Sequence, residues 1–243
     1  MELSTEMSRN KTVAISGATK GIGRALAEKF AQEGFDVAVN ARNENDLAAM
    51  TKNFAEAYPE VAIYTRPTDM SKKEEAKAFG KFAQEKLGQI DVLINNAGFF
   101  LPGLISEEED GNLEQQIETN LYSAYHLTRS VIEDMKAKKS GHVFNICSVA
   151  SLIAYPNGGS YSISKFAMLG FSKVLREEMK PHGIRVSSIM PGAVLTDSWA
   201  AYDGPKERLM KSTDVADLLW SIYNLSGQTV VEDVVLRPQL GDL

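Results

Sequence analysis

The sequence "TVAISGATKGIGRALAEKF", residues 12–30, contains the pattern from which the fold class follows. Its first five residues form an apolar run of the length expected for a short buried strand. From Ile22 onward, apolar residues recur at helical spacing as far as Gly34, and glycine is the residue that most often ends a helix. Three glycines with the spacing G-x-x-x-G-x-G, Gly17, Gly21 and Gly23, span the junction between these segments. The sequence therefore predicts a strand, a glycine-rich turn and a helix in direct succession.

The alternation of strand and helix continues to the end of the chain. Further strands are expected at 36–40, 61–65, 91–98, 141–147, 184–190 and 229–238. Further helices are expected at 44–58, 72–87, about 106–138 as one long helix or a helix pair, from about 159 to near Pro181, and 213–225. Two S-x-x-E capping boxes, Ser71–Glu74 and Ser106–Glu109, mark the start of the third and fourth helices. This order predicts an α/β fold with a doubly wound parallel sheet covered on both faces. We expect a flexible lead over residues 1–10 and a single domain over 11–243.

The composition excludes several classes of protein. The chain has 243 residues, of which 44% are hydrophobic, and a net charge of −6. An acidic chain has no general attraction for nucleic acid or for an anionic membrane. No run of about 20 apolar residues is present, and the polar N-terminus lacks the apolar segment of a secretory signal. We therefore expect a cytoplasmic protein.

The residue types that bind metals are scarce and scattered. The single cysteine, Cys147, can form neither an internal disulfide nor a zinc site alone. His126, His142 and His182 have no acidic residue at ligand spacing. We therefore expect no metal, and the absence of a G-x-S-x-G motif argues against an α/β-hydrolase.

The glycine-rich turn has the context of a dinucleotide site. Glycine permits a tight turn and close approach of the backbone to a pyrophosphate, and the N-terminus of the following helix attracts that anion. Enzymes that prefer NAD often place an acid at the end of the second strand, where this chain has Ala41 followed by Arg42. Arg42 can hold a 2′-phosphate, and Lys20 can add a second positive charge. The pattern favours NADP(H) as the cofactor, although each residue alone is equally compatible with a solvated surface charge.

Taken together, the motifs resemble those of the short-chain dehydrogenase/reductase family across nearly the whole chain. The matching segments, in order, are "SGATKGIG", "NNAG" at 95–98, Asn120 in "IETNLYSA", Ser148 in "NICSVAS", "YSISK" at 161–165 and "PGAVLT" at 191–196. The resemblance implies a seven-stranded parallel sheet in the order 3-2-1-4-5-6-7. It also implies a catalytic tetrad of Asn120, Ser148, Tyr161 and Lys165.

The resemblance further implies positions around the cofactor. Asn95, Asn96, Ala97 and Gly98 would line the adenosine ribose and support the sheet. Asp69 and Met70 would lie at the adenine. Thr19 and Ile22 belong to the pyrophosphate loop with the three glycines. Pro191, Gly192, Val194 and Thr196 would flank the nicotinamide.

Tyr161 and Lys165 lie one helical turn apart, so their side chains project from the same face. An ammonium group about 4 Å from the phenol would lower the tyrosine pKa by about three units, toward neutrality. Tyr161 would then act as general acid in reduction and general base in oxidation. Ser148 would polarise the substrate carbonyl, and Asn120 would hold a water that connects Lys165 to solvent.

Apolar and aromatic side chains follow three of the expected strands. They are Phe99, Phe100, Ala150, Leu152, Tyr155, Trp199 and Tyr202. Because ligands bind beyond the carboxyl ends of parallel strands, these residues predict a pocket for a hydrophobic or ring-bearing ketone or aldehyde. Packing of a lid or of a subunit contact would explain the same residues.

The predicted function is an NADPH-dependent carbonyl reductase or alcohol dehydrogenase. One alternative is a 3-oxoacyl-carrier-protein reductase, for which Lys206, Arg208 and Lys211 would offer a basic patch. Against it, the chain ends in "GQTVVEDVVLRPQLGDL" and lacks the V-D-G-G stretch of many such enzymes. The other alternative is a non-catalytic NADP(H)-binding sensor. The helix that carries Tyr161 is apolar on more than one face, which predicts a homodimer or homotetramer; its apolar residues are Phe166, Leu169, Phe171 and Leu175.

Overall fold

The computed structural model describes residues 10–199 and 202–242, and within them seven parallel strands form one sheet. The strands are β1 (Thr12–Ile15), β2 (Asp36–Ala41), β3 (Ile63–Pro67), β4 (Val92–Asn95), β5 (Gly141–Ile146), β6 (Ile184–Pro191) and β7 (Asp233–Leu236). Their order is β3-β2-β1-β4-β5-β6-β7, and every pairing is parallel. The predicted fold class and strand order are both confirmed. Residues 1–9 of the predicted lead lie outside the described chain.

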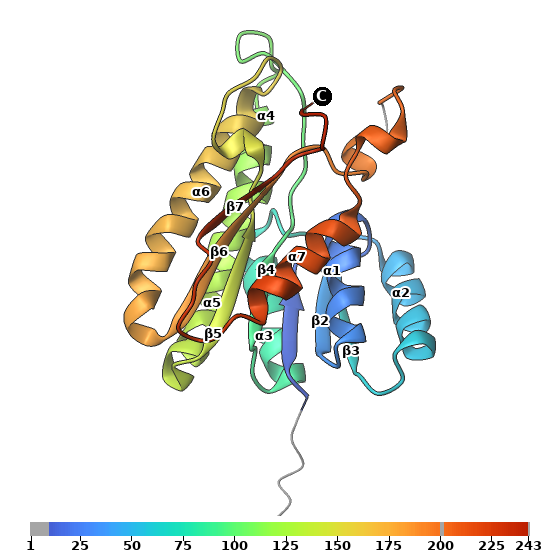
Figure 1. Ribbon diagram of the computed structural model, residues 1–243, viewed down its shortest axis with the longest axis vertical. Helices are drawn as coiled ribbons and strands as arrows, with labels where there is room; N and C mark the ends of the chain where they lie inside the picture. Colours follow the sequence, from blue (N-terminus) through green and yellow to red (C-terminus); the bar gives the residue numbers. More distant parts are fainter. Residues whose placement is uncertain (1–9, 200–201, 243) are drawn as a thin grey trace, which may run out of the picture.

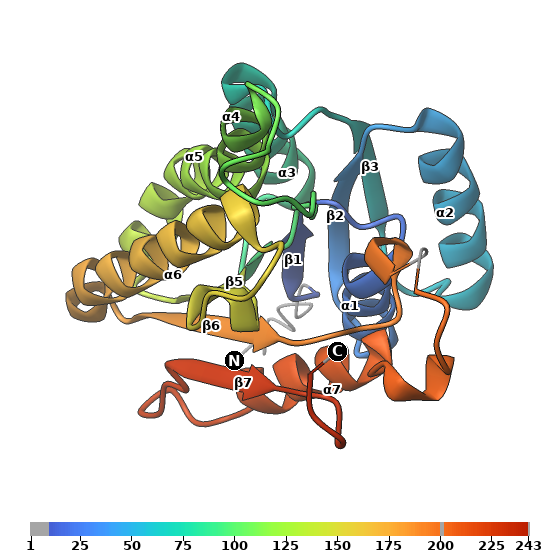
Figure 2. The ribbon, with the colours of Figure 1, turned by 90° about the horizontal axis from the view of Figure 1, so that it is seen from above.

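Helices cover both faces of the sheet (Figures 1 and 2). The helices are α1 (Gly21–Gln32), α2 (Glu44–Ala57), α3 (Lys73–Leu87), α4 (Asn112–Ile117), α5 (Ser123–Lys138), α6 (Gly159–Met179) and α7 (Ser212–Tyr223). Short turns of 3₁₀ helix occupy Val149–Ser151, Lys180–His182, Asp197–Trp199 and Lys206–Arg208, and a π-helical turn joins α4 to α5 at Glu118–Tyr122.

Alternation along the strands divides the core into two layers. Val13 and Ile15 face the cluster that includes α1, α2 and α7, whereas Ala14 faces the cluster that includes α3, α5 and α6. Successive side chains of a strand point to opposite faces, so β1 has buried residues at every position because both faces are covered. None of the described helices is both long and apolar enough to cross a membrane.

Both predicted capping boxes are wrong. Lys72 occupies the N-cap of α3 without a side-chain bond, and the Ser71 hydroxyl donates instead to Asp69. Helix α4 begins only at Asn112, after Gly111 with φ 96°. Residues 106–111 therefore form a loop. Within this loop the Glu108 carboxylate accepts a hydrogen bond from Ser160 in α6 instead of capping a helix of its own.

Strand β4 is shorter than the predicted 91–98, for a reason that bears on the site. After Asn95 the backbone leaves the sheet, and the N–H groups of Asn96 and Ala97 both donate to Ser16 Oγ at 3.0 Å. The predicted strands at 61–65 and 229–238 are also shifted or shortened, to β3 and β7. Since all strands are parallel, their carboxyl ends share one edge, and the predicted site segments follow these ends.

Candidate active site

The β1–α1 turn is held by two amide side chains, one from β2 and one from the residue that follows β4. Gly17 has φ +69°, which favours glycine, and its N–H donates to Asn40 Oδ1 at 2.9 Å. Asn96 Nδ2 donates to the carbonyl oxygens of Ser16 and Gly17 at 3.0 and 2.7 Å. The turn is therefore fixed by hydrogen bonds to β2 and to the end of β4.

Of the glycines of this turn, Gly23 leaves no room for a side chain and Gly21 leaves little. A Cβ on Gly23 would lie 2.2 Å from the Gly17 carbonyl oxygen, and one on Gly21 would lie 3.0 Å from Thr196 Cγ2. Lys20 occupies the N-cap of α1 and makes no side-chain cap, and no acidic residue lies in the first turn. This backbone cradle fits a pyrophosphate at a helix N-terminus. Ile22 packs on the core, and Thr19 lies half-buried in the turn.

Charged groups surround the expected adenosine end. Arg42 is exposed directly after β2. Burial alone would raise the pKa of Asp69, but hydrogen bonds from Ser71 and the charges of Lys72 and Arg42 outweigh it, so that this pKa lies below its usual value. The Lys20 ammonium lies 3.8 Å from Asp46 and 3.7 Å from Asp197, so two carboxylates already face it. Met70 is buried in the core.

The four residues of the "NNAG" segment have different surroundings. The Asn95 side chain is buried and donates to Thr128 Oγ1 and Asn145 Oδ1, which supports the sheet rather than the cofactor face. Asn96 and Ala97 hold the β1–α1 turn. A Cβ on Gly98 would lie 2.9 Å from Asn120 Oδ1 and 3.5 Å from Lys165 Nζ. This glycine therefore lets the chain pass over two of the predicted catalytic residues.

Three of the predicted catalytic residues come together between β5 and α6. Ser148 follows β5, and its hydroxyl accepts from the Ala150 N–H at 3.1 Å and hydrogen-bonds the Tyr161 phenol. Lys165 is 5% exposed, donates from Nζ to the Ile146 carbonyl at 3.0 Å, and has this atom 5.8 Å from the centroid of the Tyr161 ring. The Lys165 ammonium group and the Tyr161 ring thus lie on the same face of α6, as their spacing predicts.

The pKa of Tyr161 moves opposite to the predicted direction. Burial raises it, and the hydrogen bond from Ser148 only partly offsets that rise. Burial also lowers the pKa of Lys165. The predicted drop toward neutrality is therefore wrong for the chain itself, because removal of the phenol from water disfavours the phenolate. A neutral phenol is the form that donates a proton.

Asn120 lies in the π-helical turn and reaches across to the loop after β4. Its Oδ1 accepts from the Phe99 N–H at 2.8 Å, and its Nδ2 donates to the Phe99 carbonyl at 3.0 Å and to Ser164 Oγ at 2.9 Å. A π-helical turn frequently occurs at functional sites because it re-aims one side chain. Here it directs Asn120 to the backbone beside Lys165.

The segment after β6 closes the other side of the glycine turn. The Gly192 N–H donates to the Leu236 carbonyl at 2.8 Å, which keeps Pro191 and Gly192 beside β7. Val194 is buried and bridges to Met210. Thr196 lies against Gly21, so the expected nicotinamide segment and the glycine turn are in contact range.

The predicted substrate residues fall into three groups. The Phe100 ring meets the Tyr161 ring edge-on at 4.8 Å, and Phe99 is held by Asn120. Ala150 is fully buried, whereas Leu152 is 42% exposed. Trp199 and Tyr202 pack on each other at 5.9 Å. Burial raises the pKa of Tyr155, which is 37% exposed, to about 12.

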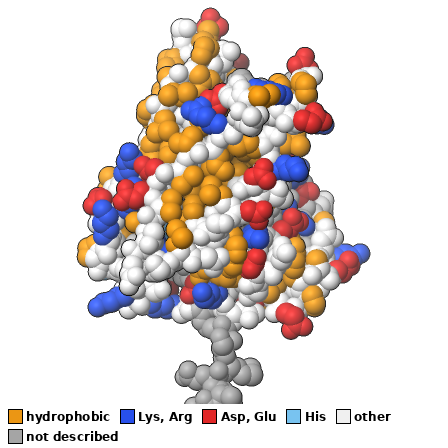
Figure 3. Space-filling view, in the orientation of Figure 1, with side chains coloured by type: hydrophobic (Ala, Val, Ile, Leu, Met, Phe, Trp, Pro, Cys, Tyr) orange, Lys and Arg blue, Asp and Glu red, His pale blue; other side chains and the backbone are white. Residues whose placement is uncertain are grey.

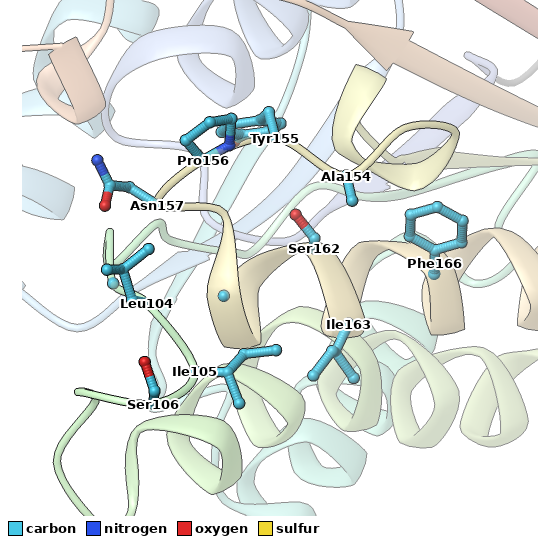
Figure 4. A pocket seen from close by; sticks show the side chains of 12 residues that line it. Leu104, Ile105, Ser106, Ala154, Tyr155, Pro156, Asn157, Ser162, Ile163 and Phe166 are labelled. Atoms are coloured by element: carbon cyan, nitrogen blue, oxygen red, sulfur yellow. The ribbon is translucent and has the colours of Figure 1, made fainter.

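A hollow of about 730 Å³ lies beside these residues, between the segments 103–106 and 154–157 and the first turns of α6 (Figure 4). Of the predicted substrate residues only Tyr155 lines it. Its α6 side is formed by Ser162, Ile163 and Phe166, which follow Tyr161 on a different face of the helix. The hollow therefore borders the candidate active site but does not contain the phenol.

Two residues that hold the site were missed by sequence reasoning. Ser16 accepts from the N–H groups after β4, and Glu108 accepts from Ser160 at the start of α6. Ser16 directly precedes the first glycine, which is a local signal that pointed to the turn. Glu108 lies in the acidic sequence "SEEED" at 106–110, which was interpreted as the first turn of a helix and did not indicate a contact with Ser160.

Comparisons with known proteins agree with this geometry. The model of the short chain dehydrogenase family matches residues 11–206. A sepiapterin reductase of Chlorobaculum tepidum is 32% identical over 238 residues, covering 94% of this chain and 96% of that protein. An uncharacterized oxidoreductase of Staphylococcus saprophyticus is 30% identical over 230 residues, covering 95% and 98%.

Two solved structures share the fold. An alcohol dehydrogenase from Thermococcus sibiricus in complex with 5-hydroxy-NADP has a TM-score of 0.88 and 27% identity, covering 95% of this chain and 97% of that one. A metagenomic short-chain oxidoreductase in complex with NADP has a TM-score of 0.82 and 28% identity, covering 94% and 97%. The chain belongs to the short-chain dehydrogenase/reductase family of NAD(P)-dependent oxidoreductases.

Proposed function

We propose that this protein is an NADPH-dependent carbonyl reductase or alcohol dehydrogenase that acts on a ketone, an aldehyde or the corresponding secondary alcohol. The observation that carries the proposal is the partly buried Tyr161, whose phenol is hydrogen-bonded by Ser148 and whose ring lies beneath the Lys165 ammonium group. This group lies beside the loop that also fixes the glycine cradle. A binding protein without chemistry has no need of this arrangement.

The cofactor, when bound, supplies the hydride. We propose that Tyr161 donates the proton to the carbonyl oxygen, for which its raised pKa keeps it in the required neutral form. Ser148 donates a hydrogen bond to the same oxygen and so stabilises the charge that develops there. Lys165 would hold the ribose hydroxyls of the bound cofactor.

For Asn120 we propose a positioning role. Its amide makes three hydrogen bonds, two of them to the Phe99 backbone, and holds the loop after β4 beside Lys165. These partners favour this role over the expected one of holding a water through the side chain.

The preference for NADP(H) over NAD(H) rests on Arg42. It follows β2 at the position where an acid would contact a ribose 2′-hydroxyl, and a guanidinium is suited to a phosphate. Lys20 is a weaker candidate, because Asp46 and Asp197 lie within 4 Å of its ammonium group. Two solved relatives in complex with NADP or 5-hydroxy-NADP support the preference.

We propose a hydrophobic or ring-bearing carbonyl substrate. Phe100 packs on Tyr161, and Leu152 and Tyr155 are partly exposed on the segment that leads into α6. A relative named sepiapterin reductase is compatible with a ring-bearing substrate. An acyl-carrier-protein thioester is the second candidate, since Lys206 and Arg208 share one 3₁₀ turn after β6.

We further propose that two or four copies of the chain associate through α5 and α6. Ile163, Phe166 and Val174 are 42%, 47% and 59% exposed along one side of α6, while Leu169 and Leu175 are buried. Figure 3 shows hydrophobic side chains on the same side of the molecule as the upper part of α6. Light scattering on the wild type and on Phe166→Glu tests this, and an unchanged mass in the variant would contradict it.

The cytoplasmic location and the single domain over 11–243 stay predictions.

The reductase proposal is tested by NADPH oxidation with a panel of ring-bearing ketones, aliphatic aldehydes, sugars and a 3-ketoacyl thioester, with NADH in parallel. We expect turnover of at least one carbonyl with NADPH, and less with NADH. Turnover of the thioester alone would favour the carrier-protein interpretation. Binding of NADPH without turnover of any carbonyl would favour the sensor.

A further inference from the structure

The acidic run Ser106–Asp110 contains one carboxylate with a distant partner. Glu108 Oε1 accepts from the Ser160 N–H at 2.9 Å, and Oε2 accepts from the Ser160 hydroxyl. These residues are 52 positions apart in sequence. Glu107 and Glu109 on either side are exposed, whereas Glu108 is partly buried. Glu108, the middle residue of the run, is therefore the one that connects this loop to α6.

Two glycines make room for this carboxylate. A Cβ on Gly159 would lie 1.9 Å from Glu108 Oε1, and one on Gly103 would lie 2.6 Å from Glu108 Cγ. Gly159 also has a positive φ of +30°. The same loops are bridged in parallel at Gly103 and Gly158, and the Gly103 N–H donates to the Asn157 carbonyl at 3.0 Å. The carboxylate is thus enclosed by backbone on two sides.

Helix α6 needs such a partner because it has no cap of its own. Its N-cap is Gly158, which has no side chain to accept from the first turn. Ser160 is the second residue of the helix, and Tyr161 follows it directly. Glu108 therefore provides, from another loop, the capping bonds that a serine or aspartate usually provides locally.

The loop that carries Glu108 also approaches Tyr161 from its other end. Phe100 lies eight positions before Glu108, and its ring contacts the Tyr161 ring at 4.8 Å. Glu108 and Phe100 thus connect one loop to the first turn of α6 at two neighbouring points. Loss of the Glu108 hydrogen bonds would increase the mobility of the first turn of α6 and of the loop segment around Phe100, which packs on Tyr161.

We infer that Glu108 is a positioning residue for Tyr161, fixing the first turn of α6 so that the phenol meets the substrate carbonyl. The inference rests on the proposed function. It predicts an effect on the chemical step and on substrate binding, but none on cofactor affinity, because the glycine cradle is held by Asn40 of β2 and by Asn96 at the start of the loop, and not by Glu108.

The test compares Glu108→Ala and Glu108→Gln with Glu107→Ala, whose exposed side chain serves as the matched control. We expect Glu108→Ala to lower kcat by about tenfold or more and to leave the Kd for NADPH within about twofold. Glu108→Gln should recover most of kcat, because an amide can still accept from the Ser160 N–H and donate to its hydroxyl. Equal kcat for Glu108→Ala and Glu107→Ala, or a parallel loss of NADPH affinity, would overturn the inference.

Amide hydrogen exchange of the peptide that contains residues 158–164 provides a second readout independent of turnover. We expect exchange there to rise by about tenfold in Glu108→Ala and to stay unchanged in Glu107→Ala. Unchanged exchange in Glu108→Ala would overturn the inference even if activity fell. If the wild type reduces no carbonyl, the proposed function fails, while the exchange result still decides whether Glu108 fixes this turn.

Discussion

The cofactor side and the substrate side of this site are built in different ways. On the cofactor side, backbone approaches backbone, and the Gly17 turn is held by Asn40 and Asn96 at 2.9 and 2.7 Å. On the substrate side, the loops present large side chains such as Leu152, which is 42% exposed. We therefore expect an atom added to the glycine turn to weaken cofactor binding strongly. Exchange of a side chain on the substrate-side loops should have only a small effect on substrate binding.

The largest effect on cofactor affinity is expected from Gly23→Ala. The new Cβ would lie 2.2 Å from the Gly17 carbonyl oxygen, so the turn must shift. We expect affinity for NADPH to fall by about tenfold to a hundredfold. Gly170→Ala on α6 is the matched control, because no atom lies within 4 Å of its added Cβ. Tight NADPH binding by Gly23→Ala, measured by fluorescence titration, would show that the cradle is less rigid than its contacts indicate.

A smaller and more selective effect is expected from Arg42→Ala. Loss of a charged hydrogen bond to a phosphate should weaken NADPH binding by about tenfold and leave NADH binding unchanged. Arg66→Ala, whose guanidinium lies over the Phe82 ring at 5.7 Å, serves as control. Equal losses for both cofactors, determined by calorimetry, would argue against a contact to the 2′-phosphate.

On the substrate side we expect a still smaller change. Leu152→Ala should raise the substrate KM by about threefold and leave the Kd for NADPH as it is, since a half-exposed leucine contributes only part of its burial energy. Steady-state kinetics with the best substrate of the panel measures both values. A change in NADPH affinity would contradict the separation of the two sides.

The least effect on either side is expected from protonation of His142. This residue is fully buried in β5, stacks on Phe144 at 3.8 Å and shares a hydrogen bond with Ser187 at 2.9 Å. Burial, with a smaller contribution from Arg185, holds its pKa well below 6.5. The unfolded chain therefore binds a proton below about pH 6.5 that the folded chain does not bind.

The consequence is a loss of stability in acid. Between pH 7 and 5 the free energy of unfolding should fall by up to about 2 kcal/mol through this residue, with no change in site geometry at pH 7. Urea denaturation of the wild type and of His142→Gln at both pH values tests it, with His182→Gln as control. A loss of the same size in His142→Gln would mean that other groups cause it.

Local patterns predicted most of the fold and the position of the site. Gly17, Gly21 and Gly23 lie where their spacing placed them, and Tyr161 and Lys165 share one face of α6. These features are readable because each depends on neighbours within a few residues of sequence, whereas the place of Ser148 beside Tyr161 was implied only by the family resemblance. The alternation of apolar runs likewise predicted a sheet covered on both faces.

Features that depend on distant partners could not be predicted. Glu108 was expected to lie in the first turn of a helix starting at Ser106, because nothing nearby in sequence indicates its bond to Ser160. The Asn120 amide was expected to hold a water, but it binds the Phe99 backbone 21 positions away. The pKa of Tyr161 depends on how deeply the phenol is buried, which no spacing rule gives.

The role of Tyr161 as proton donor is tested by comparing the wild type with Tyr161→Phe, measuring NADPH affinity and NADPH oxidation on the same samples. Phenylalanine keeps the ring that packs on Phe100 and removes only the proton donor. We predict unchanged NADPH affinity and a kcat reduced by at least about a hundredfold. Turnover by Tyr161→Phe at close to the wild-type rate would contradict the assignment of Tyr161 as the proton donor, and with it the proposed mechanism of carbonyl reduction.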